Sequence, residues 1–374
     1  MSTPAGVVHR TENGWRKSAP PTTTFSVRNL GERLDRRGVA RIYRHSYVRG
    51  QADRAVARGE AVRILPGVVA ASAVARDPRI IIRALLLWHR DIVLVGKAAL
   101  IMLGMKAPGT TRPMDFYGVK DVEAFSTTRC LTRPGIRVRR WHIPHWFITE
   151  REQIRIATAE VSVLILAIQG EWGWVCEALR QRVVTPESCR QARKSLTGRY
   201  PKTKVDAALA DICLAAWSIP ELEMGRVLRA TGITGHKPNH KVRVGDRYYY
   251  LDRAFEAEKV ALEIDGRSVH GTIDGFEATM MRSAHLDRHG WKVLHVTPTM
   301  FREDPRFVLD WLASHLHRRH RPKTMFTEFA LRRIMSAPPQ LEARLGTWLT
   351  CRKPGLTLPY PSRPLGSAAL WKSG

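Results

Sequence analysis

Two strand-like segments joined by a very short acidic loop constrain the fold of this chain more than any other feature. Residues 248–255 and 259–265 both have the pattern of β-strands, and the stretch between them is the length of a hairpin loop. If the turn is centred on the end of that loop nearer the second strand, Asp252 lies opposite Glu263. Asp265 then lies two residues further along the same strand, on the same face. The sequence therefore predicts a hairpin that carries three carboxylates on one side.

The repulsion between carboxylates in that register must be compensated. Opposed residues in antiparallel strands have Cβ atoms about 4.5–5.5 Å apart, and like charges there are unfavourable. A raised pKa, a nearby Arg or Lys, or a divalent cation would relieve the repulsion. Such a site suits Mg²⁺ or Mn²⁺, which polarises a phosphate and activates water for phosphodiester hydrolysis. The alternative is an acidic outer face that pairs with basic residues elsewhere, with Val260, Leu262 and Ile264 facing the core.

The residues after the hairpin add a candidate acid or base. Gly266 ends the second strand, and His270 follows in a loop close to the carboxylates. A helix is expected over 276–289 and a third strand over 291–297. His270 is suited to protonating a leaving oxygen or positioning a water, although loop histidines without a catalytic role are equally common.

These residues carry a resemblance to a known family. The matching residues are Asp252, Glu263-Ile264-Asp265-Gly266, His270-Gly271-Thr272, Phe276-Glu277 and Gly290-Trp291-Lys292-Val293-Leu294, with Ser218-Ile219-Pro220-Glu221 upstream. Residues 218–312 thereby resemble the endonuclease-like domains related to the very-short-patch mismatch repair endonucleases, within the PD-(D/E)xK restriction-endonuclease fold. That fold implies a mixed sheet flanked by helices and an Mg²⁺- or Mn²⁺-dependent deoxyribonuclease.

The resemblance also implies roles for individual residues. Asp252, Glu263 and Asp265 would hold the metal, with Asp265 where many relatives of the wider fold carry a lysine. His270 would match the histidine that assists in the repair endonucleases, and Glu221 the helix carboxylate that completes the site. Glu221 is also three residues after Ser218, so a capping box in which it only bonds the helix start is the alternative.

The helix over 276–289 departs from the family pattern. Arg282 is kept, and would contact the scissile phosphate or be one more arginine of a basic chain. Two aspartates usual in the family are replaced by Thr279 and Ser283. Two functions therefore stay open: an active endonuclease, or an antitoxin-like DNA-binding regulator whose nuclease fold has no turnover.

The first folded segment is expected to bind DNA. Helices are predicted over 27–37, 39–47 and 51–58, followed by strands 61–65 and 68–71 around a Pro-Gly turn. Helices followed by a β-wing indicate a winged helix-turn-helix, and the segment resembles that domain in AbiEi-type antitoxins. Arg54, Arg58 and Arg63 would then face DNA phosphates, unless they are only a solvated helix face.

The expected fold class is a multidomain α+β or α/β chain. Its parts are a disordered leader (1–25), the winged helix (26–76), a mixed, mainly helical connector (77–217), the endonuclease-like domain (218–312) and a basic tail expected to be disordered (313–374).

Charge and cysteine content narrow the class of partner. Lys and Arg number 61 against 34 Asp and Glu, a net charge of +27, which favours a polyanion such as double-stranded DNA. No apolar run reaches the roughly 18 residues of a membrane span. Five cysteines, odd in number and widely spaced, predict neither disulfides nor a zinc site and fit the cytoplasm. A homodimer would suit double-strand cleavage; the sequence identifies no partner toxin.

Overall fold

The protein has an α+β architecture. The computed structural model describes residues 29–44, 47–265, 273–320 and 326–336, and these contain thirteen α-helices and three β-sheets. The chain divides into two compact units, Met1–Arg90 and Asp91–Gly374.

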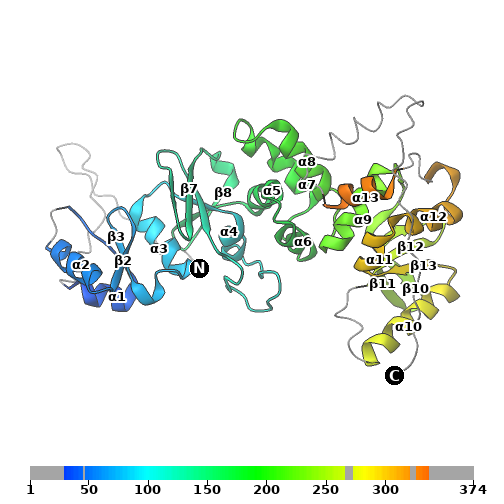
Figure 1. Ribbon diagram of the computed structural model, residues 1–374, viewed down its shortest axis with the longest axis horizontal. Helices are drawn as coiled ribbons and strands as arrows, with labels where there is room; N and C mark the ends of the chain where they lie inside the picture. The colour runs from blue at the N-terminus through cyan, green and yellow to red at the C-terminus, as the bar shows by residue number, and fades with distance from the viewer. Residues whose placement is uncertain (1–28, 45–46, 266–272, 321–325, 337–374) are drawn as a thin grey trace, which may run out of the picture. The chain divides into compact units, whose positions relative to one another are not determined.

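The first unit is a small antiparallel sheet with three helices (Figure 1). Its elements are α1 (Leu30–Arg37), β1 (Val39–Arg41), α2 (Val48–Ala57), β2 (Ala61–Leu65), β3 (Val68–Ala71) and α3 (Pro78–Trp88). The strand order is β1-β3-β2. The Asn29 side chain caps α1, and Gly38 ends it in the left-handed conformation at φ 70°. Since α3 packs on this sheet, the unit extends past the expected boundary at residue 76.

The helices and strands predicted for this unit are present except for one helix. The β2–β3 hairpin lies where it was expected, with Gly67 at φ 72° in its turn. The helix expected over 39–47 is wrong, because Val39–Arg41 form strand β1, which pairs with β3. Gly38 stops the preceding helix, and Val39 and Ala40 are then buried as sheet residues. Helix α2 also starts three residues before the predicted 51–58.

The second unit begins with a six-stranded mixed sheet. Its strands are β4 (Val93–Val95), β5 (Val122–Ser126), β6 (Leu131–Arg133), β7 (Ile136–Arg140), β8 (Ile148–Arg151) and β9 (Ile154–Ala157), in the order β6-β7-β5-β4-β9-β8. The β5–β7 and β4–β9 pairs are parallel. The connector expected over 77–217 is mixed, as predicted, but the sequence did not show that its strands over 93–157 form one six-stranded sheet. Strands of three to five residues are too short to show a clear alternation of apolar and polar positions.

One helix lies between strands of this sheet in sequence, and four follow it. Helix α4 (Gly96–Met102) lies between β4 and β5, and the four that follow β9 are α5 (Ala159–Gln169), α6 (Trp172–Arg180), α7 (Pro186–Ala192) and α8 (Lys202–Ile212). Thr185-Pro186-Glu187 has the sequence of a helix start, and Thr185 and Ser188 form reciprocal hydrogen bonds there at the start of α7. Asp211 at the end of α8 is buried and pairs with Arg226 of the next helix at 2.6 Å. This ion pair joins the helical layer to the last domain.

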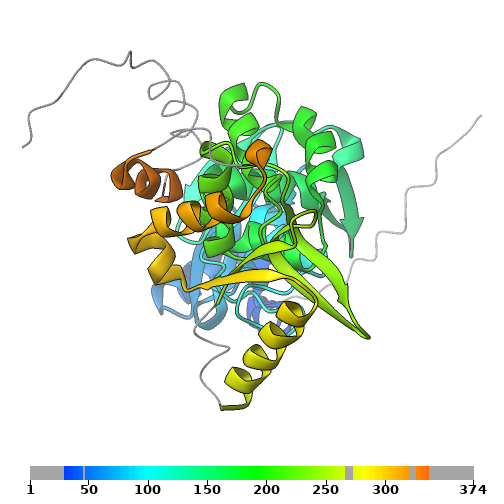
Figure 2. The same cartoon turned by 90° about the vertical axis from the view of Figure 1, so that its right-hand side faces the viewer.

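The last domain holds a four-stranded sheet between helices (Figure 2). Its elements are α9 (Ile219–Ala230), β10 (Lys237–Val244), β11 (Arg247–Phe255), β12 (Val260–Ile264), α10 (Ile273–Arg288), β13 (Lys292–Val296), α11 (Pro298–Glu303), α12 (Pro305–His315) and α13 (Glu328–Ser336). The order is β10-β11-β12-β13, antiparallel except for β12 and β13, which are parallel across α10. The predicted β11–β12 register is confirmed, since Arg253 pairs with Leu262 and Phe255 with Val260.

Both faces of the sheet are covered at strand β12. Leu262 and Phe255 pack in a core with α9, α12 and α13, whereas Ala261 packs with Leu286 of α10 and with Trp291. In Figure 2 the yellow helix α10 lies below the yellow-green strands, and gold and orange helices from later in the chain lie above them. The carboxylates of β12 are therefore not on an open outer face, because α10 covers that side.

The expectation of a disordered tail is wrong for 313–320, whereas a possible helix that the sequence indicates at 326–335 is present as α13. Helix α12 continues to His315, and α13 packs against α9. Leu331 and Ile334 are buried in the same core, and Arg226 donates a hydrogen bond to the Met335 carbonyl at 3.0 Å. The apolar residues of α13 form one buried stripe within this basic segment. The leader and the remainder of the tail lie outside the described residues.

Within the described residues, none of the helices combines the length and the apolar character that crossing a membrane requires.

Candidate metal centre

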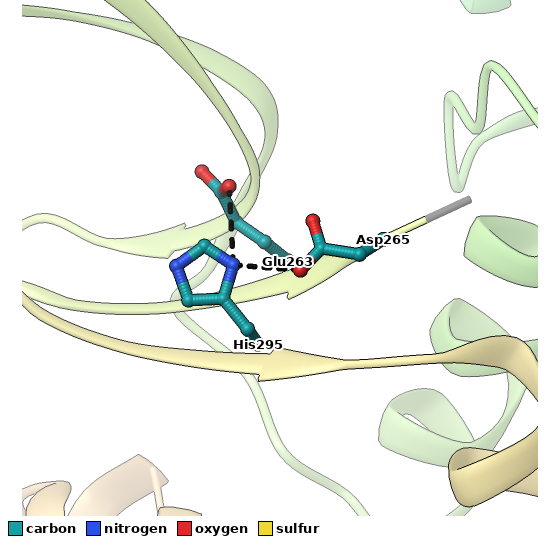
Figure 3. A group of neighbouring side chains, drawn as sticks. All are labelled: Glu263, Asp265 and His295. Carbon is teal, nitrogen blue, oxygen red and sulfur yellow. Dashed lines mark hydrogen bonds and ion pairs between the residues drawn. The ribbon is translucent and has the colours of Figure 1, made fainter. Parts of the chain in front are cut away.

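Three side chains from two neighbouring strands converge at the end of the four-stranded sheet. The parallel pairing of β12 with β13 sets Glu263 beside His295, and Asp265 follows two residues later. His295 Nδ1 lies 2.9 Å from Asp265 Oδ2 and 3.9 Å from Glu263 Oε2 (Figure 3). One ligand atom from each residue lies within 4.8 Å of the others. This group of three can hold a metal ion.

The donor set fits a divalent cation. Two carboxylates and one imidazole leave coordination positions for water or a phosphate oxygen. Glu263 is buried, whereas Asp265 and His295 are partly exposed, so the group is accessible from one side.

Glu263 and Asp265 were predicted from the sequence, but His295 was not. The sequence predicts the third strand but not which strand lies beside it. The parallel pairing of β12 and β13 across α10, which brings His295 to Glu263, was therefore not predicted. The available signal was one histidine among the apolar residues of Lys292–Val296. Placing that strand in register beside β12 would have set His295 next to Glu263.

Asp252 holds the strands together at the edge of this group. The β11–β12 ladder ends at Arg253, and Asp252 Oδ2 accepts a hydrogen bond from the Ile264 N–H at 2.8 Å. Within the described residues, Asp252 is not a member of the three-residue group. Burial, and secondly the charge of Glu221, raise the pKa of Asp252 to about 6.

Arg282 pairs with Glu263 at the edge of this group. Its Nη2 lies 2.5 Å from Glu263 Oε1 and also donates to the Tyr250 carbonyl. The guanidinium, which was expected to contact the scissile phosphate, is therefore the counter-charge of Glu263. This is one of the compensations that crowded carboxylates require.

Burial dominates the ionisation of Glu263. It raises the pKa of Glu263 to about 7, with smaller increases from Asp252 and Asp265, although Arg282 and His295 both lower it. The hydrogen bond to Asp265 raises the pKa of His295, and the negative charges of Asp265 and Glu263 add to that increase. A cation would displace these protons, because metal ligands bind in their deprotonated forms.

Glu221 belongs to the cap of α9. Its Oε2 accepts from the Trp217 N–H at 3.0 Å, and its Oε1 accepts from Ser218 Oγ at 2.9 Å. Asn239 donates a further bond to Oε2. Two roles were open for Glu221, and the structure shows the capping role. The backbone N–H that donates to Glu221 is that of Trp217, whereas the N–H of Ser218 was expected. Its charge still reaches Asp252.

The three arginines expected to face DNA lie on the first unit. Arg54 is exposed on α2. Arg58 pairs with Glu60 at 2.7 Å, and Arg63 pairs with Asp53. Exposed ion pairs of this kind are weak because water screens them, so they do not prevent the arginines from contacting a phosphate. His270 lies outside the described residues.

Comparison of this chain with protein-family models, with curated proteins and with solved structures found no match.

Proposed function

We propose that this protein binds DNA and that its last domain hydrolyses DNA phosphodiester bonds with a divalent cation held by Glu263, Asp265 and His295. The main support for this proposal is that one ligand atom from each of these three residues lies within 4.8 Å of the others at the end of the sheet. The mixed sheet flanked by helices supports the resemblance to PD-(D/E)xK endonuclease-like domains. The net charge of +27 supports a polyanionic substrate.

The donor set favours Mn²⁺ over Mg²⁺. Magnesium prefers oxygen ligands alone, whereas manganese also accepts an imidazole. When bound, such an ion would polarise a phosphate oxygen and activate a water. Other side chains would then support the site: Asp252 would fix the strands, and Ser283 Oγ, 3.1 Å from His295 Nε2, would orient the imidazole whose Nδ1 faces the two carboxylates.

Arg282 would change partners during this reaction. Without a cation its guanidinium neutralises Glu263. With a cation on Glu263 that charge becomes redundant, and Arg282 is then available to a phosphate oxygen of the substrate.

The first unit would contribute affinity. Its short helices and its three-stranded antiparallel sheet support the resemblance to the winged-helix domain of AbiEi-type antitoxins. In this proposal Arg54, Arg58 and Arg63 contact phosphates of double-stranded DNA.

A DNA-binding regulator without turnover is the second candidate. The internal pairing of the site favours it, because Glu263 is bound to Arg282 and Asp265 to His295. Thr279 and Ser283 stand where the resembling family carries aspartates.

Nicking of supercoiled plasmid separates the two candidates. The first predicts nicking with Mn²⁺ that EDTA and Glu263→Gln each abolish, while Glu256→Gln leaves it unchanged. Glu256 is a matched control, since it is an exposed acid in the turn beside the same hairpin. Gel shifts that persist without nicking under either Mn²⁺ or Mg²⁺ support the regulator instead.

A further inference from the structure

One face of the β10–β11 hairpin presents two basic side chains from β10 beside two aromatic side chains from β11. Lys241 pairs across the strands with Tyr250, and Arg243 pairs with Tyr248. All four side chains are exposed, Tyr248 by 57% and Tyr250 by 39%. We refer to these four residues as the hairpin face.

Folding of the domain does not account for this exposure. The intervening residues Val242, Val244 and Leu251 are buried against Leu286 and Trp291 on the opposite side. Strand residues alternate between faces, so the hairpin is anchored by one face and the tyrosines are left on the other. Exposed aromatic side chains that do not serve packing are typical of binding surfaces.

The rings and charges are arranged in a row. Lys241 Nζ lies 4.2 Å from the centre of the Tyr248 ring, and the Tyr250 ring lies 5.7 Å from that of Trp217. Residues two apart on one strand are about 6.6 Å apart, so each tyrosine offers a separate platform.

This chemistry fits an unpaired nucleic-acid strand. Aromatic side chains stack on bases of any sequence, and adjacent cations follow the phosphates. A duplex keeps its base faces stacked inside, so it could use the lysine and arginine but not the rings. The tyrosines therefore favour single-stranded over double-stranded DNA.

The backbone of the hairpin face is linked to the candidate metal centre, although its four side chains lie on the sheet face away from α10. Arg282 Nη2 donates both to the carbonyl of Tyr250 and to Glu263. One guanidinium thus connects the backbone of the hairpin face to a ligand of the centre.

We propose that the hairpin face binds single-stranded DNA, with bases stacked on Tyr248 and Tyr250 and phosphates held by Lys241 and Arg243. As a statement about substrate this rests on the proposed function, because it implies that the metal centre acts on unpaired or locally melted DNA. As a statement about binding it stands without cleavage.

The test is fluorescence anisotropy of the full chain with a labelled oligothymidine and with a duplex, both in EDTA. Tyr248→Ala plus Tyr250→Ala is expected to weaken oligothymidine binding about 20-fold or more, at roughly fivefold per stacked base, and duplex binding less than twofold. The pair Tyr248→Phe plus Tyr250→Phe should retain both. Tyr117→Ala, an equally exposed tyrosine elsewhere, is the matched control.

Equal losses on both DNAs, or no loss on oligothymidine while the circular dichroism of the double variant is unchanged, would overturn the inference. Glu263→Gln separates this result from the proposed function. Oligothymidine binding that survives Glu263→Gln and depends on the tyrosines supports the hairpin face even when no metal produces nicking.

Discussion

At the scale of single residues, Glu263 combines burial with several charged neighbours. Burial raises its pKa more than Arg282 and His295 lower it. The sequence predicted the crowding of Glu263 with Asp265, because residues two apart on a strand lie on the same face. It did not predict which compensation operates, since Arg282 reaches Glu263 from a helix nineteen positions away. Such a choice is made by packing in three dimensions.

Substituting Glu263 by Gln should change how stability depends on pH. The folded pKa of Glu263 is about 7 against an ordinary 4.5, so the folded state holds this proton more tightly than the unfolded state. Its contribution is therefore complete below pH 4.5 and is lost as the pH rises through 7. Relative to wild type, Glu263→Gln should gain about 1–3 kcal/mol in unfolding free energy between pH 5 and pH 8.

Urea unfolding at the two pH values measures this difference. The control is Glu256→Gln, whose acid is exposed. If the free energy of unfolding of wild type and of Glu263→Gln differs by the same amount at pH 5 and at pH 8, Glu263 ionises normally.

At the scale of elements, predictions succeeded where a local signal was strong. The β2–β3 and β11–β12 hairpins follow from their turns, and α7 follows from its cap. The parallel β12–β13 pairing depends on a crossover through α10, so its register cannot be derived from neighbouring residues. The sequence indicates a possible helix at 326–335, but the basic, proline-rich composition around it gave no sign that α13 would pack into the core of the last domain.

Helix α13 should contribute to the stability of the last domain. Leu331 is fully buried against α9 and β12 residues, so Leu331→Ala should cost about 2–5 kcal/mol. Phe329→Ala on the same helix should cost less than about 0.5 kcal/mol, because Phe329 is 71% exposed. Chemical denaturation of both variants measures the contrast. Equal and small effects would mean that α13 does not dock in solution.

At the scale of the whole molecule, the charge of +27 governs association with nucleic acid. Affinity for duplex DNA should fall steeply with salt, because each neutralised phosphate releases counterions. Arg54→Ala plus Arg58→Ala should lower the slope of log affinity against log salt by about one per lost contact. Arg180→Ala, an exposed arginine already paired with Glu177, should leave it unchanged. An unaltered slope in the double variant would place α2 away from the DNA.

Titration of Mn²⁺ into the full chain by isothermal calorimetry tests the central claim most directly. One ion per chain is expected, with affinity at least about tenfold lower in Asp265→Asn and in His295→Ala and unchanged in Glu256→Gln. Binding should strengthen from pH 6 to pH 8, as Glu263 and His295 lose their protons. If no heat is released up to millimolar Mn²⁺, or if binding is the same in all three variants, Glu263, Asp265 and His295 are not a metal centre.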